Sequence, residues 1–486
     1  MPAARRDAIR DELARTLDVR AETLARRFES TAVEIVVKRS VHLDLADYIR
    51  GLEIPGLRFV NTERRYHPKG KTLCTVLGFT NNRGHGVYGI EQILDAELFP
   101  KSGSERVERN RKGQIIGNPQ RRLENRSLDG KNVYLTIDEP IQHIVQRELA
   151  VLNEKFKPRS AYAIMADPRT GAILAMAQEP AYDPNDRSAL DPAVYRNQMV
   201  SDIYDPGSTM KCIAIAGALD YGVVRPDTVI FCENGYWIYK GRALHDAHPY
   251  GRLTVTQIIQ KSSNIGAAKI SVAVGKRRMY QVFRRFGFGT PTAIELPEES
   301  AGILRKPAAW DGLSITRFPI GQGISVTVLQ MLQAYCAIAN EGRMMKLHLI
   351  DRIEDPVSGK SIRVEPQIKH FVVRPSAARA VVSMMSLVTR SGGTARRAAV
   401  PGYDVAGKTG TSQKLIDGSY SGHGKYVASF IGFVPAHDPA MVLIVVADEP
   451  SQNGHYGGTV CAPTFQRIAE QTLKYLNILP AVAAVQ

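Results

Sequence analysis

Three short motifs in this chain carry the residue types that covalent serine chemistry needs. They are Ser208-Thr209-Met210-Lys211, Ser262-Ser263-Asn264 and Lys408-Thr409-Gly410-Thr411, and they occur in that order. The first is the only Ser-x-x-Lys match in the sequence, and Lys-Thr-Gly also occurs once. Together the motifs supply a nucleophilic hydroxyl, amines and a second hydroxyl to move its proton, and a strand edge to hold an acyl substrate.

Ser208 follows the helix breaker Asp205-Pro206-Gly207, and the sequence after Lys211 is apolar on all sides. We therefore expect a buried helix that begins at Ser208, where free backbone N–H groups favour developing negative charge. Lys211 then lies one turn along on the same face, within reach of the Ser208 hydroxyl. Burial and a second cation both lower the pKa of a lysine, so we predict that Lys211 is the general base.

The second motif follows a predicted helix that ends at Gln260-Lys261. We predict that Ser262 relays a proton between the base and the leaving amine. The Asn264 amide offers both a donor and an acceptor to a peptide. The backbone N–H groups of Ser208 and Thr411 are expected to form an oxyanion hole, in which each donor is worth about 2.7–4 kcal/mol.

The third motif lies in a segment, 405–412, that reads as a strand. On a strand, Lys408 and Gly410 face one way, whereas Thr409 and Thr411 face the other. The glycine permits a ligand backbone to approach closely. We expect the Lys408 ammonium and the threonine hydroxyls to bind a terminal carboxylate.

The elements that position these motifs predict an α+β fold. A helix capped by Asp138 is expected to run to about residue 154, and a final helix is expected at 463–477. Between them lies a mostly helical stretch at 205–345. Strands are predicted at 133–137, 161–166, 172–177, 426–434 and 441–446. Strands near both ends with helices between them indicate one antiparallel sheet that is closed by the two ends of the chain.

The first 130 residues have a different texture. Helical spacing of apolar residues predicts one amphipathic helix at 7–29, alternation predicts a strand at 32–37, and a second helix is expected at 43–51. Residues 101–130 are strongly basic, with turns at Lys112-Gly113 and Asp129-Gly130. We place a domain boundary near 130, which gives an N-terminal domain at 1–130 and a second domain at 131–480.

Composition excludes several classes of function. The chain has 486 residues and a net charge of +15, but its basic residues have no interleaved aromatic platform, so a nucleic-acid partner is not expected. Five scattered cysteines without a Cys-x-x-Cys argue against a disulfide framework or a zinc site. His245-Asp246-Ala247-His248 has no third ligand nearby and reads as a loop, so neither a metal nor a cofactor is expected. No run of about 18 apolar residues is present to span a bilayer.

The three motifs in this order resemble those of the penicillin-binding protein and serine β-lactamase superfamily. The likeness covers about residues 35–475, and Asn264 and Thr409 resemble the division-type, FtsI-like branch. Other segments resemble the pedestal (65–68, 77–80 and 86–91) and the transpeptidase domain (320–323, 339–340, 430–435 and 456–458) of class B penicillin-binding proteins. The resemblance implies a transpeptidase domain with helices on both faces of an antiparallel sheet, joined to an elongated dimerisation-type pedestal.

The resemblance further implies a serine D,D-transpeptidase that crosslinks peptidoglycan. Its substrates would be the stem peptides of peptidoglycan and lipid II. Ser208 would attack the penultimate D-Ala carbonyl, release D-Ala and form an acyl-enzyme, which an amine of a neighbouring stem resolves. In this family Lys211 is the expected base, and Ser262 and Lys408 assist proton transfer. The expected substrate-binding residues are Asn264, Thr409, Gly410 and Thr411. β-Lactams would acylate the same serine.

Partners and location are also implied by the resemblance alone. Members of the family normally carry a membrane helix that is not seen here, so we expect this chain to start past its anchor. Its catalytic domain is then expected on the extracytoplasmic side of the plasma membrane. Without a glycosyltransferase domain before the pedestal, a separate SEDS-type (FtsW-like) polymerase and other divisome proteins are expected as partners in septal wall synthesis.

Two alternatives share the motifs. A β-lactamase or D,D-carboxypeptidase would hydrolyse the acyl-enzyme, but no Glu-x-x-Leu-Asn segment follows Asn264 to activate a deacylating water. A non-catalytic penicillin-binding sensor or divisome scaffold would keep the fold without crosslinking. Persistence of a penicilloyl adduct separates the hydrolase, and crosslinking of lipid-linked strands separates the scaffold.

Overall fold

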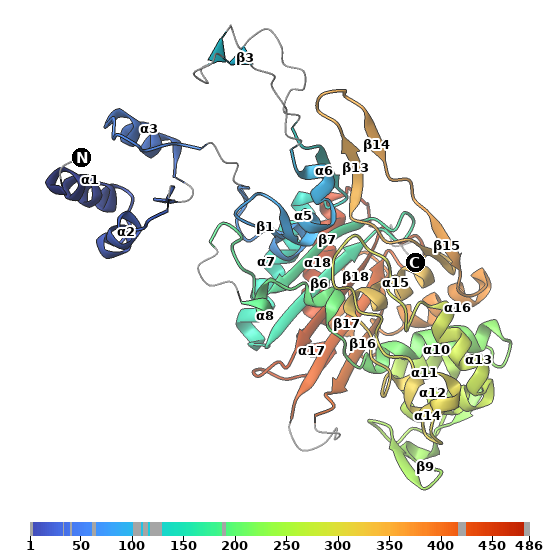
Figure 1. Ribbon diagram of the computed structural model, residues 1–486. Helices are drawn as coiled ribbons and strands as arrows, with labels where there is room; N and C mark the ends of the chain where they lie inside the picture. Colours follow the sequence, from blue (N-terminus) through green and yellow to red (C-terminus); the bar gives the residue numbers. More distant parts are fainter. Residues whose placement is uncertain are drawn as a thin grey trace. The chain divides into compact units, whose positions relative to one another are not determined.

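The computed structural model describes residues 3–32, 34–38, 41–60, 65–100, 108–109, 115–116, 129–186, 191–416 and 424–480. The chain divides into two compact units (Figure 1). Unit 1 consists of Met1–Tyr66 with Thr80–His85, and unit 2 consists of His67–Phe79 with Gly86–Gln486. All three catalytic motifs lie in unit 2. The predicted turn at Lys112-Gly113 lies outside the described residues.

Unit 1 is built from helices α1 (Ala3–Thr16), α2 (Ala21–Phe28) and α3 (Leu43–Gly51). The third helix was predicted, but the single helix expected at 7–29 is wrong. The chain leaves the helical conformation at Asp18, where φ is +49°, and α2 starts in a new direction. Leu17 and Leu24 nevertheless share one small apolar core, which is why one amphipathic pattern covers both helices.

The strand expected at 32–37 is also wrong for the described part of that segment. The Arg27 guanidinium donates hydrogen bonds to the carbonyl oxygens of Val36 (3.0 Å) and Val37 (2.7 Å). A side chain therefore takes up acceptors that a neighbouring strand would otherwise use.

The core of unit 2 is a five-stranded antiparallel sheet in the order β16-β17-β18-β6-β7. Its strands are β6 (Ser160–Ala166), β7 (Ile173–Glu179), β16 (Ala406–Gln413), β17 (Tyr426–Val434) and β18 (Met441–Asp448). Strands from the two ends of the unit pair with each other between β18 and β6. This confirms the predicted α+β fold and its sheet.

Helices cover both faces of this sheet (Figure 1). Helices α7 (Glu139–Phe156) and α18 (Ala462–Tyr475) pack on one face, where Phe465 of α18 meets Phe430 edge-on at 4.7 Å. The Asp138 carboxylate caps α7 as predicted, because it accepts a hydrogen bond from the Ile141 N–H at 3.1 Å. Helix α15 (Val328–Ala339) packs against the other face and is buried along its whole length.

The segment 205–345 is helical at its centre, but it also contains two strand pairs that the sequence did not predict. The helices are α10 (Met210–Asp220), α11 (Val255–Lys261), α12 (Asn264–Val274), α13 (Lys276–Arg285), α14 (Ser314–Arg317) and α15. The strands are β8 (Val229–Phe231), β9 (Tyr236–Tyr239), β10 (Arg242–His245) and β11 (Arg252–Thr254). These strands are short and mostly exposed, so they lack a strong alternation of apolar and polar residues.

The remaining elements are short or peripheral. A second sheet joins β5 (Asn132–Leu135), β13 (Ile350–Glu354) and β14 (Ser361–Arg363), and β12 (Arg343–Met345) pairs with β15 (Ile368–Phe371). Further helices are α4 (Cys74–Leu77), α5 (Gly89–Ile93), α6 (Asp95–Leu98), α8 (Pro192–Tyr195), α9 (Gln198–Ser201), α16 (Pro375–Ser386) and α17 (Gly457–Val460). The minor strands are β1 (Phe79–Thr80), β2 (Gly86–Tyr88), β3 (Glu108–Arg109) and β4 (Ile115–Ile116).

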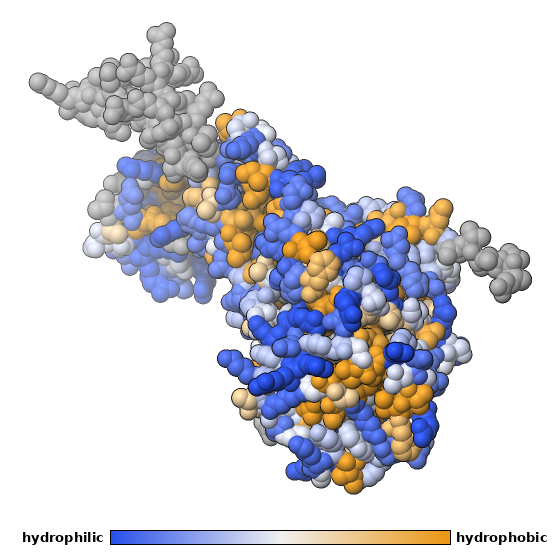
Figure 2. Space-filling model, turned by 90° about the vertical axis from the view of Figure 1, so that its right-hand side faces the viewer, coloured by the Kyte–Doolittle hydropathy of each residue, from blue (hydrophilic) through white to orange (hydrophobic). Residues whose placement is uncertain are grey.

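Two further features concern the surface and the cysteines. Figure 2 shows one face on which several apolar patches lie among hydrophilic residues. All five cysteines, Cys74, Cys212, Cys232, Cys336 and Cys461, are buried and free. Within the described ranges, no helix combines the length and apolar character needed to cross a bilayer.

Candidate active site

Ser208 lies in a tight turn that leads directly into the buried helix α10. The turn is the 3-10 helix Gly207–Thr209, and its backbone is tied on both sides: Gly207 N–H donates to the Gly321 carbonyl (3.2 Å), and the Thr209 carbonyl accepts from the Tyr335 hydroxyl (2.8 Å). Helix α10 is buried from its first residue through Ala218. The predicted position of Ser208 at the start of a buried helix is therefore confirmed.

The turn before Ser208 needs glycine on both sides of a close backbone approach. Gly207 has φ +60°, and Gly321 has φ +76°. A Cβ at Gly321 would lie 2.2 Å from the Gly207 carbonyl oxygen, which no real side chain tolerates. The backbone around Gly321 thus packs directly against the turn that contains Ser208.

Lys211 is fully buried, and its amine lies at the centre of the site. Its Nζ is 3.0 Å from Ser208 Oγ, 3.0 Å from Ser262 Oγ, 2.6 Å from the Ser262 carbonyl oxygen and 2.7 Å from Asn264 Oδ1. The structure therefore brings together the residues that the first two motifs predict. The amine joins the two hydroxyls that the reaction needs.

Counting donors shows what a neutral Lys211 amine can do here. The Ser262 carbonyl oxygen and Asn264 Oδ1 can only accept, and they use both N–H groups of a neutral amine. The orientation of the Asn264 amide is fixed, since its Nδ2 donates to the His245 carbonyl at 2.8 Å. The nitrogen lone pair is then left for a serine hydroxyl, and this is the geometry of a general base for Ser208.

The electrostatics favour that neutral amine. Burial, and then the nearby Lys408 ammonium, hold the pKa of Lys211 well below its usual range. Burial also lowers the pKa of Lys408, to about 8. Lys408 Nζ lies 2.9 Å from Ser262 Oγ, so the Ser262 hydroxyl bridges the two amines.

Ser262 reaches this position through an uncommon backbone conformation. It is the residue that ends α11, and its φ of +61° and ψ of +40° place it in the left-handed region. The next residue, Ser263, caps α12 by accepting a hydrogen bond from the Gly266 N–H at 2.9 Å. Non-glycine residues in this region cost of order 1–3 kcal/mol and are concentrated at functional sites.

Strand β16 carries the third motif along the edge of the sheet. Lys408 and Gly410 are buried, whereas Thr409 and Thr411 are partly exposed, as the alternation predicted. A Cβ at Gly410 would lie 2.2 Å from Ser429 Oγ and 3.0 Å from the Pro206 carbonyl. The sequence suggested that this glycine admits a ligand; the structure gives a different reason, the close approach of β16 to the nucleophile turn.

The two threonine hydroxyls of this motif have partners within the protein. Thr409 Oγ1 lies 3.2 Å from Thr394 Oγ1, and Thr411 Oγ1 accepts a hydrogen bond from the Gly457 N–H at 3.0 Å. The roles of both residues in substrate binding, and of the Thr411 N–H in an oxyanion hole, stay predictions. Their position beside Lys408 on an edge strand is compatible with those roles.

Sequence reasoning missed one residue of the site, Asp246. The segment 245–248 was set aside as a loop, but His245 is the last residue of strand β10. Asp246 accepts hydrogen bonds from Ser263 Oγ (2.6 Å), from the Ile265 N–H (3.0 Å) and from the Asn264 N–H. No local pattern could reveal this, because only the fold brings the end of β10 to the start of α12.

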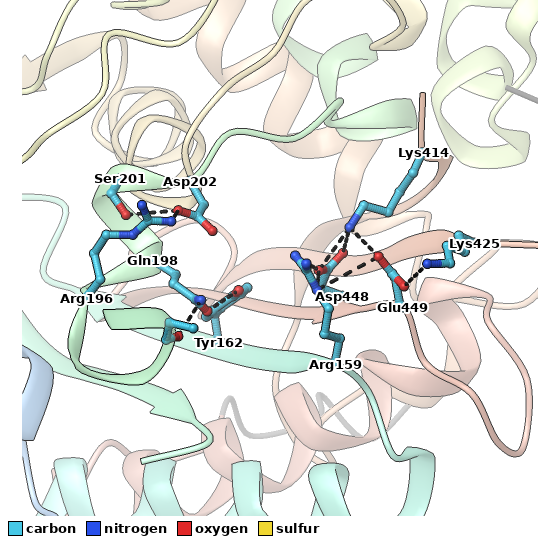
Figure 3. A network of polar contacts seen from close by, with 11 residues as sticks. Arg159, Tyr162, Arg196, Gln198, Ser201, Asp202, Lys414, Lys425, Asp448 and Glu449 are labelled. Atoms are coloured by element: carbon cyan, nitrogen blue, oxygen red, sulfur yellow. Dashed lines mark hydrogen bonds and ion pairs between the residues drawn. The ribbon is translucent and has the colours of Figure 1, made fainter. Parts of the chain in front are cut away.

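A polar network fixes the far end of β16, at the point where it leaves the site (Figure 3). The buried Asp448 carboxylate of β18 lies 2.9 Å from Lys414 Nζ and 2.7 Å from an Arg159 guanidinium nitrogen. A cavity of 290 Å³ lies beside this network, on the sheet face that α15 covers, and its lining includes Asp205 and Ser412 but none of the catalytic motif residues named above. The cavity is therefore separate from the hydroxyls and amines of the three motifs.

Family models and related proteins match most of the chain. The family model for the penicillin binding protein transpeptidase domain matches residues 161–470, and the model for the penicillin-binding protein dimerisation domain matches residues 2–135. A probable peptidoglycan D,D-transpeptidase, PenA, of Neisseria gonorrhoeae is 34% identical over 99% of this chain and 80% of its own length. Peptidoglycan D,D-transpeptidase FtsI of Escherichia coli is 34% identical over 96% of this chain and 77% of its own.

Solved structures agree with these relatives. Penicillin binding protein 3 from Mycobacterium tuberculosis, complexed with ampicillin, superimposes with a TM-score of 0.78 at 32% sequence identity. The match covers 87% of this chain and 91% of that one. The fold described above, from the edge strand to the helices on both sheet faces, is therefore shared with a protein that holds a β-lactam.

Proposed function

This chain belongs to the penicillin-binding protein family of peptidoglycan D,D-transpeptidases, and from that premise we propose that it works through an acyl-enzyme on Ser208. The observation that carries the proposal is the position of the Lys211 amine. It lies 3.0 Å from Ser208 Oγ, is fully buried, and has its two N–H groups directed to obligate acceptors. A hydroxyl next to such an amine is activated for attack on an acyl carbon.

In the acylation step, Ser208 Oγ attacks the carbonyl carbon of the penultimate D-Ala of a donor stem. Its proton passes to Lys211, and the new oxyanion is stabilised by the backbone N–H groups of Ser208 and Thr411. When the C–N bond breaks, the proton moves from Lys211 through Ser262 to the departing D-Ala amine. Lys211 is neutral again at the end of this step.

In the transfer step, an amine from a neighbouring stem attacks the ester carbonyl. Lys211 accepts a proton from this amine, and the proton returns to Ser208 Oγ as the ester bond breaks. The same base therefore serves both half-reactions. The donor is held by the Asn264 amide, by Thr409 and Thr411, and by the Lys408 ammonium facing the terminal carboxylate.

β-Lactams are proposed to acylate the same hydroxyl. Support comes from the ampicillin and aztreonam complexes of the Mycobacterium tuberculosis protein, whose fold this chain shares. Incubation with penicillin followed by intact-protein and peptide mass spectrometry is the test. We expect one penicilloyl adduct on the peptide that contains residue 208. The adduct should be absent in Ser208→Ala and unchanged in the surface control Ser358→Ala.

Persistence of the adduct distinguishes the transferase from a hydrolase. An adduct that remains for many minutes supports a transpeptidase, whereas rapid return of unmodified protein indicates a β-lactamase or D,D-carboxypeptidase. Adducts on any peptide other than that of residue 208, or none at all, would contradict the acyl-enzyme. Crosslinking of lipid-linked strands then tests whether the acyl group reaches an amine.

The cellular setting is proposed from the relatives. Among the relatives are peptidoglycan D,D-transpeptidases named FtsI and PenA. From the resemblance to the FtsI-like branch we propose that this chain acts in septal wall synthesis on the outer side of the plasma membrane, together with a SEDS-type polymerase and other divisome proteins. The matches to the dimerisation model at 2–135 and the transpeptidase model at 161–470 support a functional boundary near residue 130. Loss of septal localisation after depletion of the polymerase would be the expected result of this arrangement.

A further inference from the structure

The loop after β10 contacts the second motif at several atoms. The Asp246 carboxylate binds the side chain of Ser263 and the backbone N–H groups of Asn264 and Ile265. The preceding residue, His245, receives the Asn264 side-chain N–H at its carbonyl oxygen. The last residue of β10 and the residue after it thus hold both the side-chain amide and the backbone of Asn264.

Asn264 passes this constraint on to Lys211. Its Oδ1 lies 2.7 Å from Lys211 Nζ and takes one of the two N–H groups of the neutral amine. If the amide were free to turn, its NH₂ group could face the amine, and two donors would then meet. The lone pair of Lys211 would no longer be reserved for a serine hydroxyl.

We propose that Asp246 is a positioning residue of the reaction, which holds Asn264 so that the Lys211 lone pair faces the serine hydroxyls. Asp246 does not touch the reacting atoms in this structure; it acts through Asn264 and Lys211. The inference rests on the acyl-enzyme route proposed above and assigns a role to a residue that the three motifs do not contain.

The charge of Asp246 has a second effect. Its carboxylate raises the pKa of Lys211, which opposes the larger lowering by burial and by Lys408. A general base works best when its pKa is near the working pH, so a partial correction of a strongly lowered pKa is useful. The charged or titratable groups that change the pKa of Lys211 are Lys408 of β16, Asp246 and the neighbouring Cys212. Asp246 in turn raises the pKa of Cys232 and of Tyr250.

Asparagine at position 246 separates charge from position. One oxygen of Asp246 accepts from both backbone N–H groups, and an asparagine oxygen can do the same. The Ser263 hydroxyl, which donates to the other oxygen, can rotate and accept from an NH₂ group instead. Asp246→Asn therefore keeps the contacts and removes the charge, whereas Asp246→Ala removes both.

The test measures the rate of Ser208 acylation by a chromogenic β-lactam as a function of pH, in the full chain. Without the Asp246 charge, the pKa of Lys211 falls further and its deprotonated form persists to lower pH. The acid limb of the Asp246→Asn profile should therefore move to lower pH, and the rate above that limb should fall less than in Asp246→Ala. Asp246→Ala should lose roughly 10²-fold in rate, the scale expected when a catalytic group is misplaced by about 1 Å.

Asp311→Asn is a matched control, because Asp311 also binds a serine hydroxyl and two backbone N–H groups but does not contact Lys211 or Asn264. Its pH profile should equal that of the wild type.

An acid limb that stays in place in Asp246→Asn, or a full rate in Asp246→Ala, would overturn the inference. If Asp246→Asn does not fold, Asp246→Glu replaces it: a lower rate with an unmoved acid limb supports the inference, and an unchanged rate overturns it. Acylation of wild-type Ser208 tests the proposed function separately.

Discussion

Two buried lysines dominate the chemistry of this site at the scale of single residues. Lys211 and Lys408 are both 0% exposed, and the Ser262 hydroxyl lies about equally far from their amines, at 3.0 and 2.9 Å. The Lys408 ammonium makes Lys211 harder to protonate, because like charges in a buried site repel, whereas the pKa of Lys408 is lowered by burial. Both shifts favour loss of a proton, and the proposed mechanism assigns the role of base to Lys211 and that of cation to Lys408.

The pair predicts a bell-shaped pH dependence for acylation of Ser208. The rate should rise as Lys211 loses its proton, because its pKa is lowered and only the neutral amine is a base. It should fall again near pH 8, where Lys408, which we propose to hold the donor carboxylate, loses its proton. Rates measured with a carboxylate-bearing β-lactam across this range provide the check. The surface variant Lys360→Met should keep both limbs, and a rate that is flat through pH 8 would exclude the role of Lys408.

Lys408 should also make the protein less stable at neutral pH. Burial lowers its pKa to about 8 in the folded protein, from 10.5 for an ordinary lysine. Between these pH values the unfolded chain therefore holds a proton that the folded protein has released. The penalty is fully present below pH 8 and disappears as the pH rises toward 10.5. We expect Lys408→Met to raise the free energy of unfolding at pH 7 by up to about 3 kcal/mol, less the hydrogen bonds it loses.

Urea unfolding of this variant at two pH values measures the effect. The advantage of Lys408→Met over the wild type should shrink at pH values near 10, while acylation is lost at every pH. Lys360→Met, which changes an exposed lysine, should be neutral throughout. A Lys408→Met variant that is less stable than the wild type at pH 7 would show that burial of this ammonium costs little.

At the scale of elements, the site depends on the contact between β16 and the nucleophile turn. Gly410 lies against the Pro206 carbonyl and the Ser429 hydroxyl, and the Ser412 hydroxyl donates to the Asp205 carbonyl at 2.6 Å. These contacts set the distance between the edge strand and Ser208. A small outward shift of β16 would separate Lys408 from Ser262.

Gly410→Ala tests this contact. Its Cβ would meet Ser429 Oγ at 2.2 Å, so the strand or the serine has to move, and we expect acylation to fall by roughly 10²-fold. Removing the obstructing hydroxyl in Gly410→Ala/Ser429→Ala should recover part of the rate. Gly251→Ala, whose Cβ meets nothing closer than 3.5 Å, is the control. Full activity in Gly410→Ala would mean that the spacing of β16 is not critical.

The central sheet of unit 2 and the helices that flank it could be predicted from the sequence, whereas many peripheral elements and several contacts could not. The strands of the central sheet and helices α7 and α18 have strong apolar patterns, and tertiary burial agrees with them. The pairs β8–β11 and β9–β10 are short and exposed, so no pattern announces them. The motif residues were found because their spacing is local; Asp246 was not, because its partners lie in another element.

At the scale of the whole molecule, residues before 130 contribute to unit 2 as well as to unit 1. The Tyr182 hydroxyl donates to the Cys74 carbonyl at 2.8 Å, and the Tyr88 hydroxyl accepts from the Asn197 N–H at 2.9 Å. Val76 is fully buried in the main core. The functional boundary proposed near residue 130 therefore does not coincide with the boundary between the two compact units.

Two truncated chains test whether residues 67–130 stabilise unit 2. A fragment of residues 67–486 keeps these contacts, whereas a fragment of residues 131–486 exposes their apolar partners to water. We expect the shorter fragment to unfold at a lower temperature, by about 2 °C or less for each kcal/mol lost at this chain length, although both contain all three motifs. Thermal melts with and without bound penicillin provide the measurement. Equal melting temperatures would show that residues 67–130 add nothing to unit 2.

Because all five thiols are buried, their chemical modification can report local unfolding of this protein. Burial raises the pKa of each cysteine, for Cys74 to about 11, so the reactive thiolate is scarce and shielded while the fold is intact. A pulse of maleimide would thus modify only molecules that have transiently loosened. The five cysteines lie at separate places in unit 2, so the first peptide to be modified would reveal where that loosening starts.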